Sequence, residues 1–486
     1  MSSTTVSKEL LQARFVGKTL HNVPTPSVVL DLAKVEANCN LMLEAAHRLQ
    51  MSWRAHIKTH KTAELTRLQV GADSNEPVNI ITSTLAEAEN VVPLLKEFQQ
   101  KGRKVDILYS FPIYASAVER LATISSQLGP NSLTVMVDHI DQIKYLTELA
   151  SKSGNPPRVF LKINVGTNRA GVFAGTPSCT DLINALLLSQ TVGSSIFWGL
   201  YCHAGHSYAA RKDWEAMGIL GIEFAALHDV ALTIRKDRPD QALVLSVGAT
   251  PTATTLQHPD FGHSEAGSAV EQDAGGALLM KGVDTNDVQA ATAQMKDLIT
   301  KMRAANLTLE VHAGVYPTLD VQQLAAHARD SSFLNPNAIA ISVLADIASV
   351  YPARGPNGTT EALVNAGCLA LGREPCTDMG AVKGQHYGAW GILMPWDGVK
   401  NEVPGPEFPA VHGGWQVARI SQEHGVLTWM GKKEDETPLA VGQRVRIWPN
   451  HSCITGAGHP WYLVVDSRNK GREDEVVDVW PRWNGW

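Results

Sequence analysis

Apolar residues follow two different spacings in turn along residues 23–334. Short apolar or alternating runs such as PSVVLDL, NIITST, DILYSF, LTVMVD and RVFLKINV are typical of strands. Between them lie stretches with apolar positions three and four apart, such as AKVEANCNLMLEAAHRLQ and IDQIKYLTELASKS, which predict amphipathic helices. Strands that alternate with helices indicate parallel βα units, and this many units favour a closed (β/α)8 barrel of the TIM type.

The pattern changes at about residue 334, where short β-like runs separated by Gly, Pro and Asn begin, such as AIAISVLADIASVYPA and WYLVVDS. We therefore expect an N-terminal extension over 1–22, the barrel over 23–334 and a second, mainly β domain over 335–486. The first strand, PSVVLDL, is open to pairing with the β domain instead. A Gly-, Ala- and Asp-rich insertion at about 253–290 interrupts the barrel.

Composition narrows the class of protein. The 486 residues are 44% hydrophobic and 19% charged, as is typical of a globular enzyme with a large core. A net charge of −6 gives no support to nucleic-acid or anionic-membrane partners. The six cysteines have no CxxC spacing, and the polar N-terminus lacks the apolar core of a signal peptide. We therefore expect a cytoplasmic protein with reduced thiols, and no membrane span, because no run of 18 apolar residues occurs.

The stretch RAHIKTHK, residues 54–61, concentrates basic side chains. Trp53, Ile57 and Thr59 favour a strand, on which alternate side chains share a face. That face would carry Arg54, His56, Lys58 and His60. A lysine crowded by cations loses its proton more readily and becomes a nucleophile suited to Schiff-base chemistry, which favours Lys58 over Lys61. A solvated helix face is the alternative.

Two further segments place candidate residues after strands. In NVGTNRAGV, Arg169 lies in a glycine-rich turn, where a surface arginine is the alternative. GLYCHAGHSY ends a strand with His203 and His206 beside Tyr201 and Tyr208. Residues at the carboxyl end of a barrel strand face the active site, although a buried histidine with structural partners is the more common situation.

Two late segments, SVGATPT (246–252) and HAGVYP (312–317), are glycine-containing strand ends. Exposed backbone N–H groups there, with hydroxyls from Ser246, Thr250 and Thr252, would suit a phosphate group. Simple loops are the alternative for each segment.

A metal site is suggested by IWPNHSC, in which His451 and Cys453 lie two residues apart. Imidazole and thiolate on one face of an extended segment suit Zn²⁺, although this short motif is weak by itself. His459 is available as a third ligand but is not required by the spacing.

Together these segments resemble the D-serine dehydratase-like and D-threonine aldolase family, pyridoxal-phosphate enzymes of the alanine-racemase fold type. The similarity runs in the same order from TPSVVLDL and WRAHIKTHKTAELTRLQ to QEHG and PNHSC, and covers most of the chain outside the tail and the insertion. HIKTHK and PNHSC carry most of its specificity. Many relatives carry arginine where this chain has His312, which leaves the partner of the pyridine nitrogen open.

The resemblance implies a role for each candidate. Lys58 would hold pyridoxal phosphate covalently, Arg169 would lie near its phenolic oxygen and the substrate, and His203 would lie against its ring. His56 and Tyr201 are expected among the cofactor contacts. The phosphate would be held by Ser246, Gly248, Thr250, Gly314, Val315 and Tyr316. His451 and Cys453 would bind Zn²⁺ or another divalent metal, and the aldolase branch is expected to have aspartate in place of Cys453.

The expected activity is a pyridoxal-phosphate- and zinc-dependent β-elimination that converts D-serine to pyruvate and ammonia. The alternative within the family is retro-aldol cleavage of a D-β-hydroxy amino acid to glycine and an aldehyde, and Cys453 favours elimination. D-threonine and 3-hydroxyaspartate are further candidate substrates, and a non-catalytic pyridoxal-phosphate carrier is the alternative of another class. We expect a small D-amino acid, no nucleic acid and no membrane as partners, and a homodimer.

Overall fold

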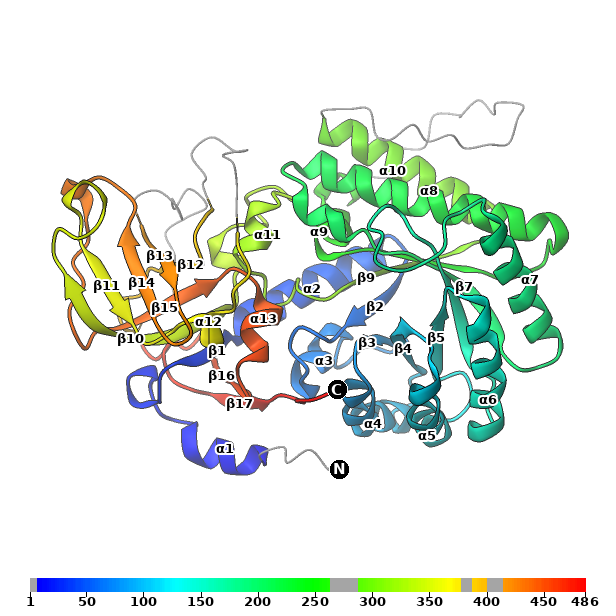
Figure 1. The fold of residues 1–486 in the computed structure, drawn as a ribbon, viewed down its shortest axis with the longest axis horizontal. Coiled ribbons are helices and arrows are strands. Elements are labelled where there is room, and N and C mark those ends of the chain that lie inside the picture. The colour runs from blue at the N-terminus through cyan, green and yellow to red at the C-terminus, as the bar shows by residue number, and fades with distance from the viewer. Residues whose placement is uncertain (1–6, 263–286, 377–386, 400–413) are drawn as a thin grey trace. The chain divides into compact units, whose positions relative to one another are not determined.

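The computed structural model describes residues 7–262, 287–376, 387–399 and 414–486, and Figure 1 traces its helices and strands. The chain forms two compact units. One contains residues 41–58, 69–314 and 485–486, and the other contains residues 1–40, 59–68 and 315–484. In this division residues 315–334, expected with the barrel, group with the β strands, as do the N-terminal residues and the first strand, whose pairing with the β domain was left open. The expected insertion at 253–290 lies largely outside the described residues.

The first unit contains the predicted barrel, which is confirmed. Eight parallel strands close on themselves in sequence order. They are β2 (Ser52–His56), β3 (Val78–Thr82), β4 (Val105–Pro112), β5 (Leu133–Val137), β6 (Arg158–Lys162), β7 (Ile196–Tyr201), β8 (Val244–Val247) and β9 (Thr308–Ala313).

Helices connect successive barrel strands and lie on the outside of the barrel (Figure 1). They include α4 (Leu85–Gln100), α5 (Val118–Leu128), α6 (Ile143–Ser153), α7 (Pro177–Thr191), α8 (Asp213–Asp237), α9 (Thr250–Thr254) and α10 (Val288–Ala304). Helix α5 shows why these segments fold in this way: its apolar residues recur three and four apart, and that stripe is buried. Two further helices, α2 (Leu32–Arg48) and α3 (Ala63–Gln69), each continue across the division between the units.

Helix α8 is long and apolar enough to cross a membrane by length and composition, and no other helix among the described residues has this property. Most of its apolar stretch is buried, because it packs on α10 and on strands β7 and β8. Its hydrophobic composition is therefore accounted for by its place in the barrel unit.

Charged side chains pair inside the barrel. Arg54 on β2 donates from Nε to Glu310 on β9 at 2.7 Å and from Nη2 to Asp106 on β4 at 2.9 Å. The Asp106 carboxylate also accepts a hydrogen bond from Thr134 on β5. All of these side chains are buried. Removing one member of a buried ion pair costs about 3–5 kcal/mol, because its partner is left as an unpaired charge.

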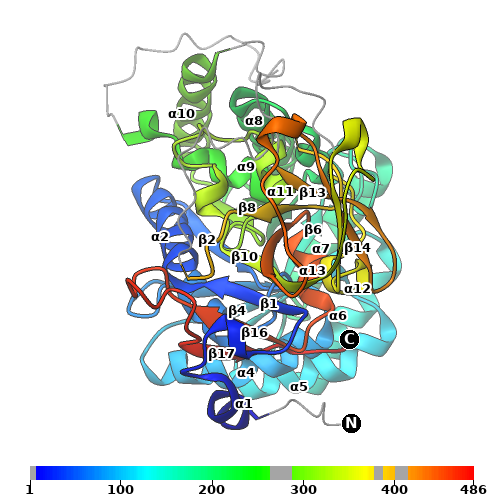
Figure 2. The same cartoon turned by 90° about the vertical axis from the view of Figure 1, so that its left-hand side faces the viewer.

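The second unit is built on a nine-stranded sheet with the order β11-β14-β13-β12-β15-β10-β1-β16-β17. Its strands are β1 (Ser27–Asp31), β10 (Ile341–Tyr351), β11 (Glu361–Val364), β12 (Gly391–Met394), β13 (Trp415–Ile420), β14 (Gly425–Trp429), β15 (Arg444–Pro449), β16 (Trp461–Val465) and β17 (Asp478–Pro481). Strand β1, the first strand in the sequence, pairs antiparallel with β10 and parallel with β16, as Figure 2 shows, and has no place in the barrel. Four short helices belong to this unit: α1 (Lys8–Phe15), α11 (Val321–Ala325), α12 (Cys368–Leu371) and α13 (Ser452–Ala457).

Alternation along β10 gives this sheet two apolar faces. Val343, Ala345 and Ile347 pack in one cluster with side chains of β11, β13, β14 and β15. Leu344 points to the opposite face, where Leu463 and residues of α1 complete a second cluster. Full burial of a valine or leucine side chain contributes roughly 1.5–3 kcal/mol, so both faces hold the sheet together.

Candidate active site

Lys58 follows the first strand of the barrel. Strand β2 ends at His56 and a turn follows, so the strand is shorter than expected and only Arg54 and His56 share its inner face. His60, which was expected on that face, is buried in the other unit, and so it does not belong to the set. Lys61 also lies in the other unit, with a left-handed φ of 51°. Lys58 is therefore the lysine of this stretch that belongs to the barrel unit.

Arg54 was expected to crowd Lys58 with positive charge, and this expectation was wrong. The positive charge of Arg54 is neutralised by Glu310 and Asp106, so Arg54 does not crowd the lysine as a free cation. The groups that feel the charge of Lys58 are three histidines on the same unit, His56, His203 and His312.

These three histidines are held neutral. Burial, and next the charge of Lys58, lowers the pKa of His56 well below its ordinary value and the pKa of His203 to about 3. Burial, and next His203, lowers the pKa of His312 well below its ordinary value. The neighbourhood of Lys58 is thus made of imidazoles that accept or donate single hydrogen bonds without carrying charge.

The tautomer of His203 follows from its partner. Its Nδ1 lies 2.7 Å from the carbonyl oxygen of Gly248, and a carbonyl only accepts, so Nδ1 carries the proton. Nε2 of the neutral ring therefore presents a lone pair. Gly248 has a φ of 137°, and a Cβ there would collide with the carbonyl oxygen of His312, so only glycine fits beneath the histidine.

A buried relay fixes the tautomer of His312 in the same way. Glu310 accepts a hydrogen bond from Arg54, and the Ser246 hydroxyl donates its single proton to Glu310 at 2.7 Å. The Ser246 oxygen, 3.1 Å from Nδ1 of His312, must then accept from that nitrogen. Nε2 of His312 is buried and has no hydrogen-bond partner among the described residues. The Tyr201 ring stacks on His312 with centroids 4.4 Å apart.

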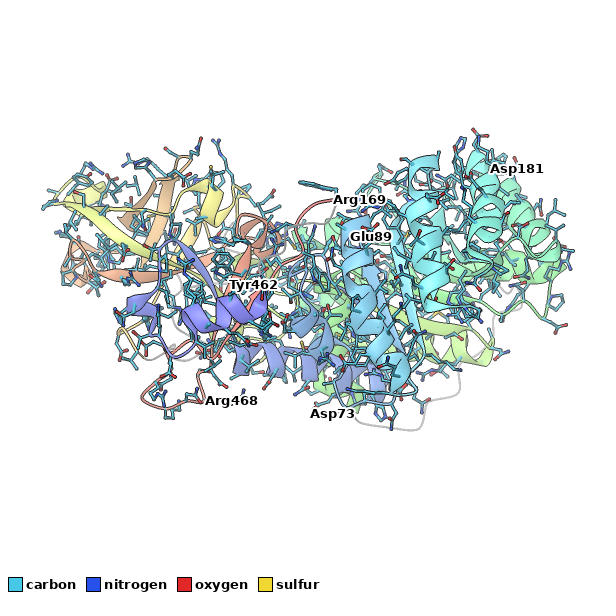
Figure 3. The ribbon with its side chains drawn as sticks, turned by 90° about the horizontal axis from the view of Figure 1, so that it is seen from below. Asp73, Glu89, Arg169, Asp181, Tyr462 and Arg468 are labelled. Atoms are coloured by element: carbon cyan, nitrogen blue, oxygen red, sulfur yellow. The ribbon has the colours of Figure 1, made fainter. Side chains whose placement is uncertain are left out.

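Two basic residues lie near the end of β6, one at the last position of the strand and one in the loop that follows. Arg169 is exposed in the loop after this strand (Figure 3), whereas Lys162, the last residue of β6, is 5% exposed. Nζ of Lys162 lies 4.6 Å from the centre of the Tyr201 ring, its register neighbour on β7. Burial, and then the charge of Arg169, lowers the pKa of Lys162 to about 8.

Several polar groups of the segment 246–252, where the phosphate is expected, have partners within the protein. The Ser246 hydroxyl is bound to Glu310, and the Gly248 amide donates to Glu223 on α8 at 3.3 Å. The Ala249 amide donates to Thr252 at 2.9 Å. Ser246 and Gly248 therefore hold the barrel interior and His203. The remaining residues expected at the phosphate are all buried. They are Thr250 at the start of α9 and Gly314, Val315 and Tyr316 after β9. Val315 and Tyr316 belong to the other unit.

His451 and Cys453 lie together in the second unit, at the start of α13. Their side chains are hydrogen-bonded, and Sγ of Cys453 lies 3.1 Å from Oγ1 of Thr59, the residue bonded to Lys58 in the chain. Burial alone would lower the pKa of His451, but Cys453 and nearby carboxylates, including Asp320, raise it to about 9. Asp320 also accepts the amide proton of the residue between the two candidate ligands at 2.9 Å, which fixes their backbone.

The fit of this pair to a metal can be tested on its atoms. Nδ1 of His451 is buried without a hydrogen-bond partner in the described part of the chain, and with the Cys453 sulfur it forms a donor pair that suits Zn²⁺. Nε2 of His459 donates to the carbonyl of Ala370 at 3.0 Å, so Nδ1 is the ring atom that this residue has left for a metal. Within the described ranges, no group of three or more His, Cys, Asp and Glu side chains is arranged to hold a metal ion.

The barrel residues fit pyridoxal phosphate. The fold unit offers a lysine amine, three uncharged imidazoles with a buried acceptor atom on His312, and the cations Arg169 and Lys162 for an anionic ring oxygen or carboxylate. Lys162 and Glu310 were missed by sequence reasoning, although both lie at inward positions of strands that alternate. Glu223 was missed as well, and its signal is a single acidic residue in the apolar run GILGIEFAAL.

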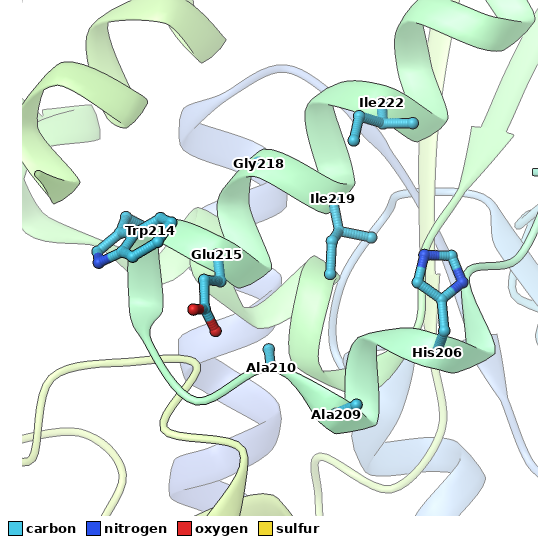
Figure 4. Close-up of a pocket in the computed structure, with 8 residues that line it drawn as sticks. All are labelled: His206, Ala209, Ala210, Trp214, Glu215, Gly218, Ile219 and Ile222. Carbon is cyan, nitrogen blue, oxygen red and sulfur yellow. The ribbon is translucent and has the colours of Figure 1, made fainter. Parts of the chain in front are cut away.

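A cavity of about 340 Å³ lies elsewhere on this unit, between α8 and the short turn at 205–209 (Figure 4). Its lining consists of His206, Ala209, Ala210, Trp214, Glu215, Gly218, Ile219 and Ile222. None of the residues placed around Lys58 is among them. His206, noted in the sequence beside His203, therefore points to a different surface.

Comparison with known proteins agrees with this geometry. Residues 30–271 match the family model "Alanine racemase, N-terminal domain", and residues 340–465 match "Putative serine dehydratase domain". The chain is 35% identical to the D-serine dehydratase of Schizosaccharomyces pombe, over 99% of this chain and 96% of that protein. It is 30% identical to the D-serine dehydratase of Saccharomyces cerevisiae, over 98% of this chain and 99% of that protein.

Among solved structures, the D-threo-3-hydroxyaspartate dehydratase from a Delftia species has the same fold, with a TM-score of 0.68 at 23% identity over 96% of this chain and 100% of that one. The two family models fall on the barrel and on the nine-stranded sheet, and the full-length relatives cover both. The chain is therefore an enzyme that belongs to the D-serine dehydratase family of pyridoxal-phosphate-dependent D-amino acid lyases.

Proposed function

We propose that this enzyme converts D-serine to pyruvate and ammonia by β-elimination, with a divalent metal, Zn²⁺, held by His451 and Cys453. The observation that carries the proposal is the neighbourhood of Lys58, where the lysine faces neutral histidines at the carboxyl end of the barrel strands. Two relatives over nearly the full length are D-serine dehydratases, which supports D-serine as the substrate.

Bound pyridoxal phosphate supplies an electron sink for the charge that develops when a proton leaves Cα of the amino acid. The work of this chain is to manage that proton. The Lys58 amine would take it from Cα, because the imidazoles around it have lowered pKa values and are weaker bases than an amine. Arg169 and Lys162 provide positive charge for the substrate carboxylate or an anionic ring oxygen.

The neutral histidines set the polarity of the site. His203 and His312 each carry their proton on Nδ1, so both present Nε2 as an acceptor. The Tyr201 ring stacks on the His312 imidazole, which holds the plane of that ring in place and shields it from water. Such fixed, uncharged groups orient a ligand through hydrogen bonds and do not themselves become protonated.

His451 and Cys453 would hold the metal, which supplies Lewis acidity for the departure of a β-hydroxyl group. The chain gives this role two supports. First, Nδ1 of His451 is buried without a hydrogen-bond partner among the described residues, and this histidine lies beside the thiol of Cys453. Second, Cys453 contacts Thr59, which is the next residue after Lys58 in the chain. In the overall reaction water leaves the amino acid and is then added back, so that D-serine yields one pyruvate and one ammonia.

Retro-aldol cleavage is the second candidate, and the chemistry of Cys453 argues against it. An imidazole and a thiolate together favour a borderline-soft ion that binds a hydroxyl as a leaving group. A carboxylate in place of the thiolate would favour a harder ion. The test is to supply D-serine, D-threonine, D-3-hydroxyaspartate and L-serine to the purified enzyme and to measure keto acids, glycine and ammonia. We expect D-serine to yield pyruvate and an equimolar amount of ammonia, and L-serine to yield neither. Glycine as the main product would overturn the assignment.

A homodimer and a cytoplasmic location belong to this proposal as well, because the resemblance to the family implies the first and the reduced cysteines support the second. Sedimentation of the purified protein at several concentrations tests the dimer. A single species with the mass of one chain would contradict it.

A further inference from the structure

We propose that Glu223, on helix α8, is a positioning residue that fixes both the orientation and the tautomer of His203. The proposal rests on the function proposed above only in giving His203 a part in the reaction. The contacts that carry it are independent of substrate and cofactor.

The Glu223 carboxylate joins the loops that follow two neighbouring barrel strands. Its Oε1 accepts hydrogen bonds from the amide of Ala204, after β7, at 2.8 Å and from the amide of Gly248, after β8, at 3.3 Å. Its Oε2 accepts from the Thr252 hydroxyl at 3.1 Å, and that hydroxyl in turn accepts the amide proton of Ala249. Glu223 is fully buried, so water does not substitute for any of these partners.

His203 lies between the points that Glu223 holds. The residue after it, Ala204, is bound to Oε1 through its amide. The ring of His203 donates from Nδ1 to the carbonyl of Gly248, and the amide of Gly248 is bound to the same oxygen. Moving Glu223 would therefore move the backbone of His203 and the acceptor of its ring proton together.

The arrangement needs an acceptor at Oε1 more than it needs a negative charge. No cation hydrogen-bonds to Glu223 among the described residues, and burial raises its pKa to about 7. A glutamine would keep the acceptor oxygen for both amides, while its amide nitrogen would face a hydroxyl that is able to accept as well as donate. An aspartate would keep the charge but withdraw the carboxylate by about 1.5 Å.

These differences define the experiment. Glu223→Gln, Glu223→Asp and Glu223→Ala are compared with the wild type by nitrogen NMR of ring-labelled histidine in the cofactor-free protein, with His203 assigned from a His203→Asn spectrum. In the wild type and in Glu223→Gln, His203 is expected as a neutral ring protonated on Nδ1. In Glu223→Asp and Glu223→Ala, the His203 signals are expected to shift toward a mixture of tautomers.

Kinetics give the second readout. We expect kcat to fall roughly ten- to hundredfold in Glu223→Asp, because a displacement of this size misplaces a group that acts on the substrate or cofactor. Glu223→Gln is expected to stay within about threefold of the wild type, and this rescue by the longer side chain would not follow from a simple loss of charge. If Glu223→Ala does not fold, the aspartate and glutamine variants decide the question.

A matched control is Glu87→Gln with Glu87→Asp on helix α4. Glu87 is buried, and its carboxylate accepts the amide proton of Ser83 after β3, so it holds a different loop from the two that Glu223 joins. The control pair is expected to leave the His203 signals unchanged. An unchanged His203 tautomer in Glu223→Asp would overturn the inference. Because the NMR result does not require turnover, a protein inactive on D-serine but with this His203 response would contradict the proposed function alone.

Discussion

The hydroxyl of Ser246 donates a hydrogen bond to the carboxylate of Glu310 at 2.7 Å, deep inside the barrel. This serine links the Arg54–Glu310 ion pair to Nδ1 of His312. Because a hydroxyl has one proton, this single bond decides which nitrogen of His312 carries hydrogen.

Ser246→Ala is expected to leave the His312 Nδ1–H group without its acceptor. Loss of one partner of a buried hydrogen bond costs about 1–3 kcal/mol, and the His312 ring is expected to lose its single tautomer in nitrogen NMR spectra. Ser189→Ala is the matched control, because Ser189 and Ser195 form another buried hydroxyl pair, at 2.8 Å, on α7 and just before β7. A similar loss of stability without a change at His312 is expected there. A change at His312 in both variants would contradict the relay.

The attachment of the cofactor distinguishes the two lysines of RAHIKTHK. Lys58→Ala is expected to abolish the covalent bond to pyridoxal phosphate, whereas Lys61→Ala, whose lysine lies in the other unit with left-handed backbone, is expected to retain it. Borohydride reduction followed by peptide mapping makes the comparison. Cofactor recovered on Lys61 in the wild type would refute the assignment.

The neutral histidines predict a specific dependence of stability on pH. The pKa of His203 is about 3 in the folded protein, below the ordinary value of about 6.5, so the unfolded chain takes up protons there while the native ring does not. The stability that comes from keeping this ring neutral is therefore complete above about pH 6.5 and is lost as the pH falls toward 3. His203→Gln is expected to flatten the fall in the unfolding free energy between pH 6 and pH 4 in urea titrations. An unchanged slope would mean that His203 is charged in the native state.

The phosphate is expected at Gly314, Val315 and Tyr316 after β9, together with Ser246, Gly248 and Thr250. Gly314→Val is expected to weaken the binding of pyridoxal phosphate by roughly tenfold or more while leaving kcat at saturating cofactor within a small factor, because the added methyls obstruct an anion and not the reacting atoms. Spectroscopic titration of the cofactor-free enzyme measures this. Gly102→Ala, a positive-φ glycine whose Cβ would meet open space, is the control, and equal affinities in the two variants would exclude Gly314 from the phosphate site.

The barrel was predictable from the sequence because each strand and helix leaves a periodic pattern that does not depend on distant residues. The parity of β2 put Arg54 and His56 on one face, but the strand ends at His56, and residues 59–68 belong to the other unit. His60 was misplaced for that reason. The pairing of β1 with β10 joins residues more than three hundred positions apart, and local pattern left that choice open.

The site was predictable in its residue types and less so in its partners. Lys58, Arg169 and His203 belong to one unit, as motif and strand position suggested. Glu310, Glu223 and Lys162 were not found, because a single charged residue on an apolar strand or helix has the same sequence pattern whether it pairs with Arg54, binds loop amides or stays unpaired. The partner of the Ser246 hydroxyl was not predicted for the same reason: it comes from a neighbouring strand that sequence spacing does not identify.

Replacing Cys453 tests whether the metal is catalytic or structural. Cys453→Ala is expected to lose bound zinc and ammonia release together, while the fold and the covalent cofactor are retained, because the pair would leave positions open for water and substrate. Cys368→Ala, at a partly exposed cysteine with no assigned role, is the control and should match the wild type. Zinc retained in full by Cys453→Ala would remove this residue from the metal site.

The most direct test of the account is pyruvate formation from D-serine by the purified enzyme before chelation, after chelation and after zinc is added back, with bound metal measured in each sample. We predict about one zinc per chain in the active enzyme, loss of pyruvate and ammonia formation with the metal, and recovery of both on adding zinc, while covalently bound pyridoxal phosphate stays constant. Undiminished pyruvate formation by enzyme shown to contain no metal would contradict metal-dependent β-elimination.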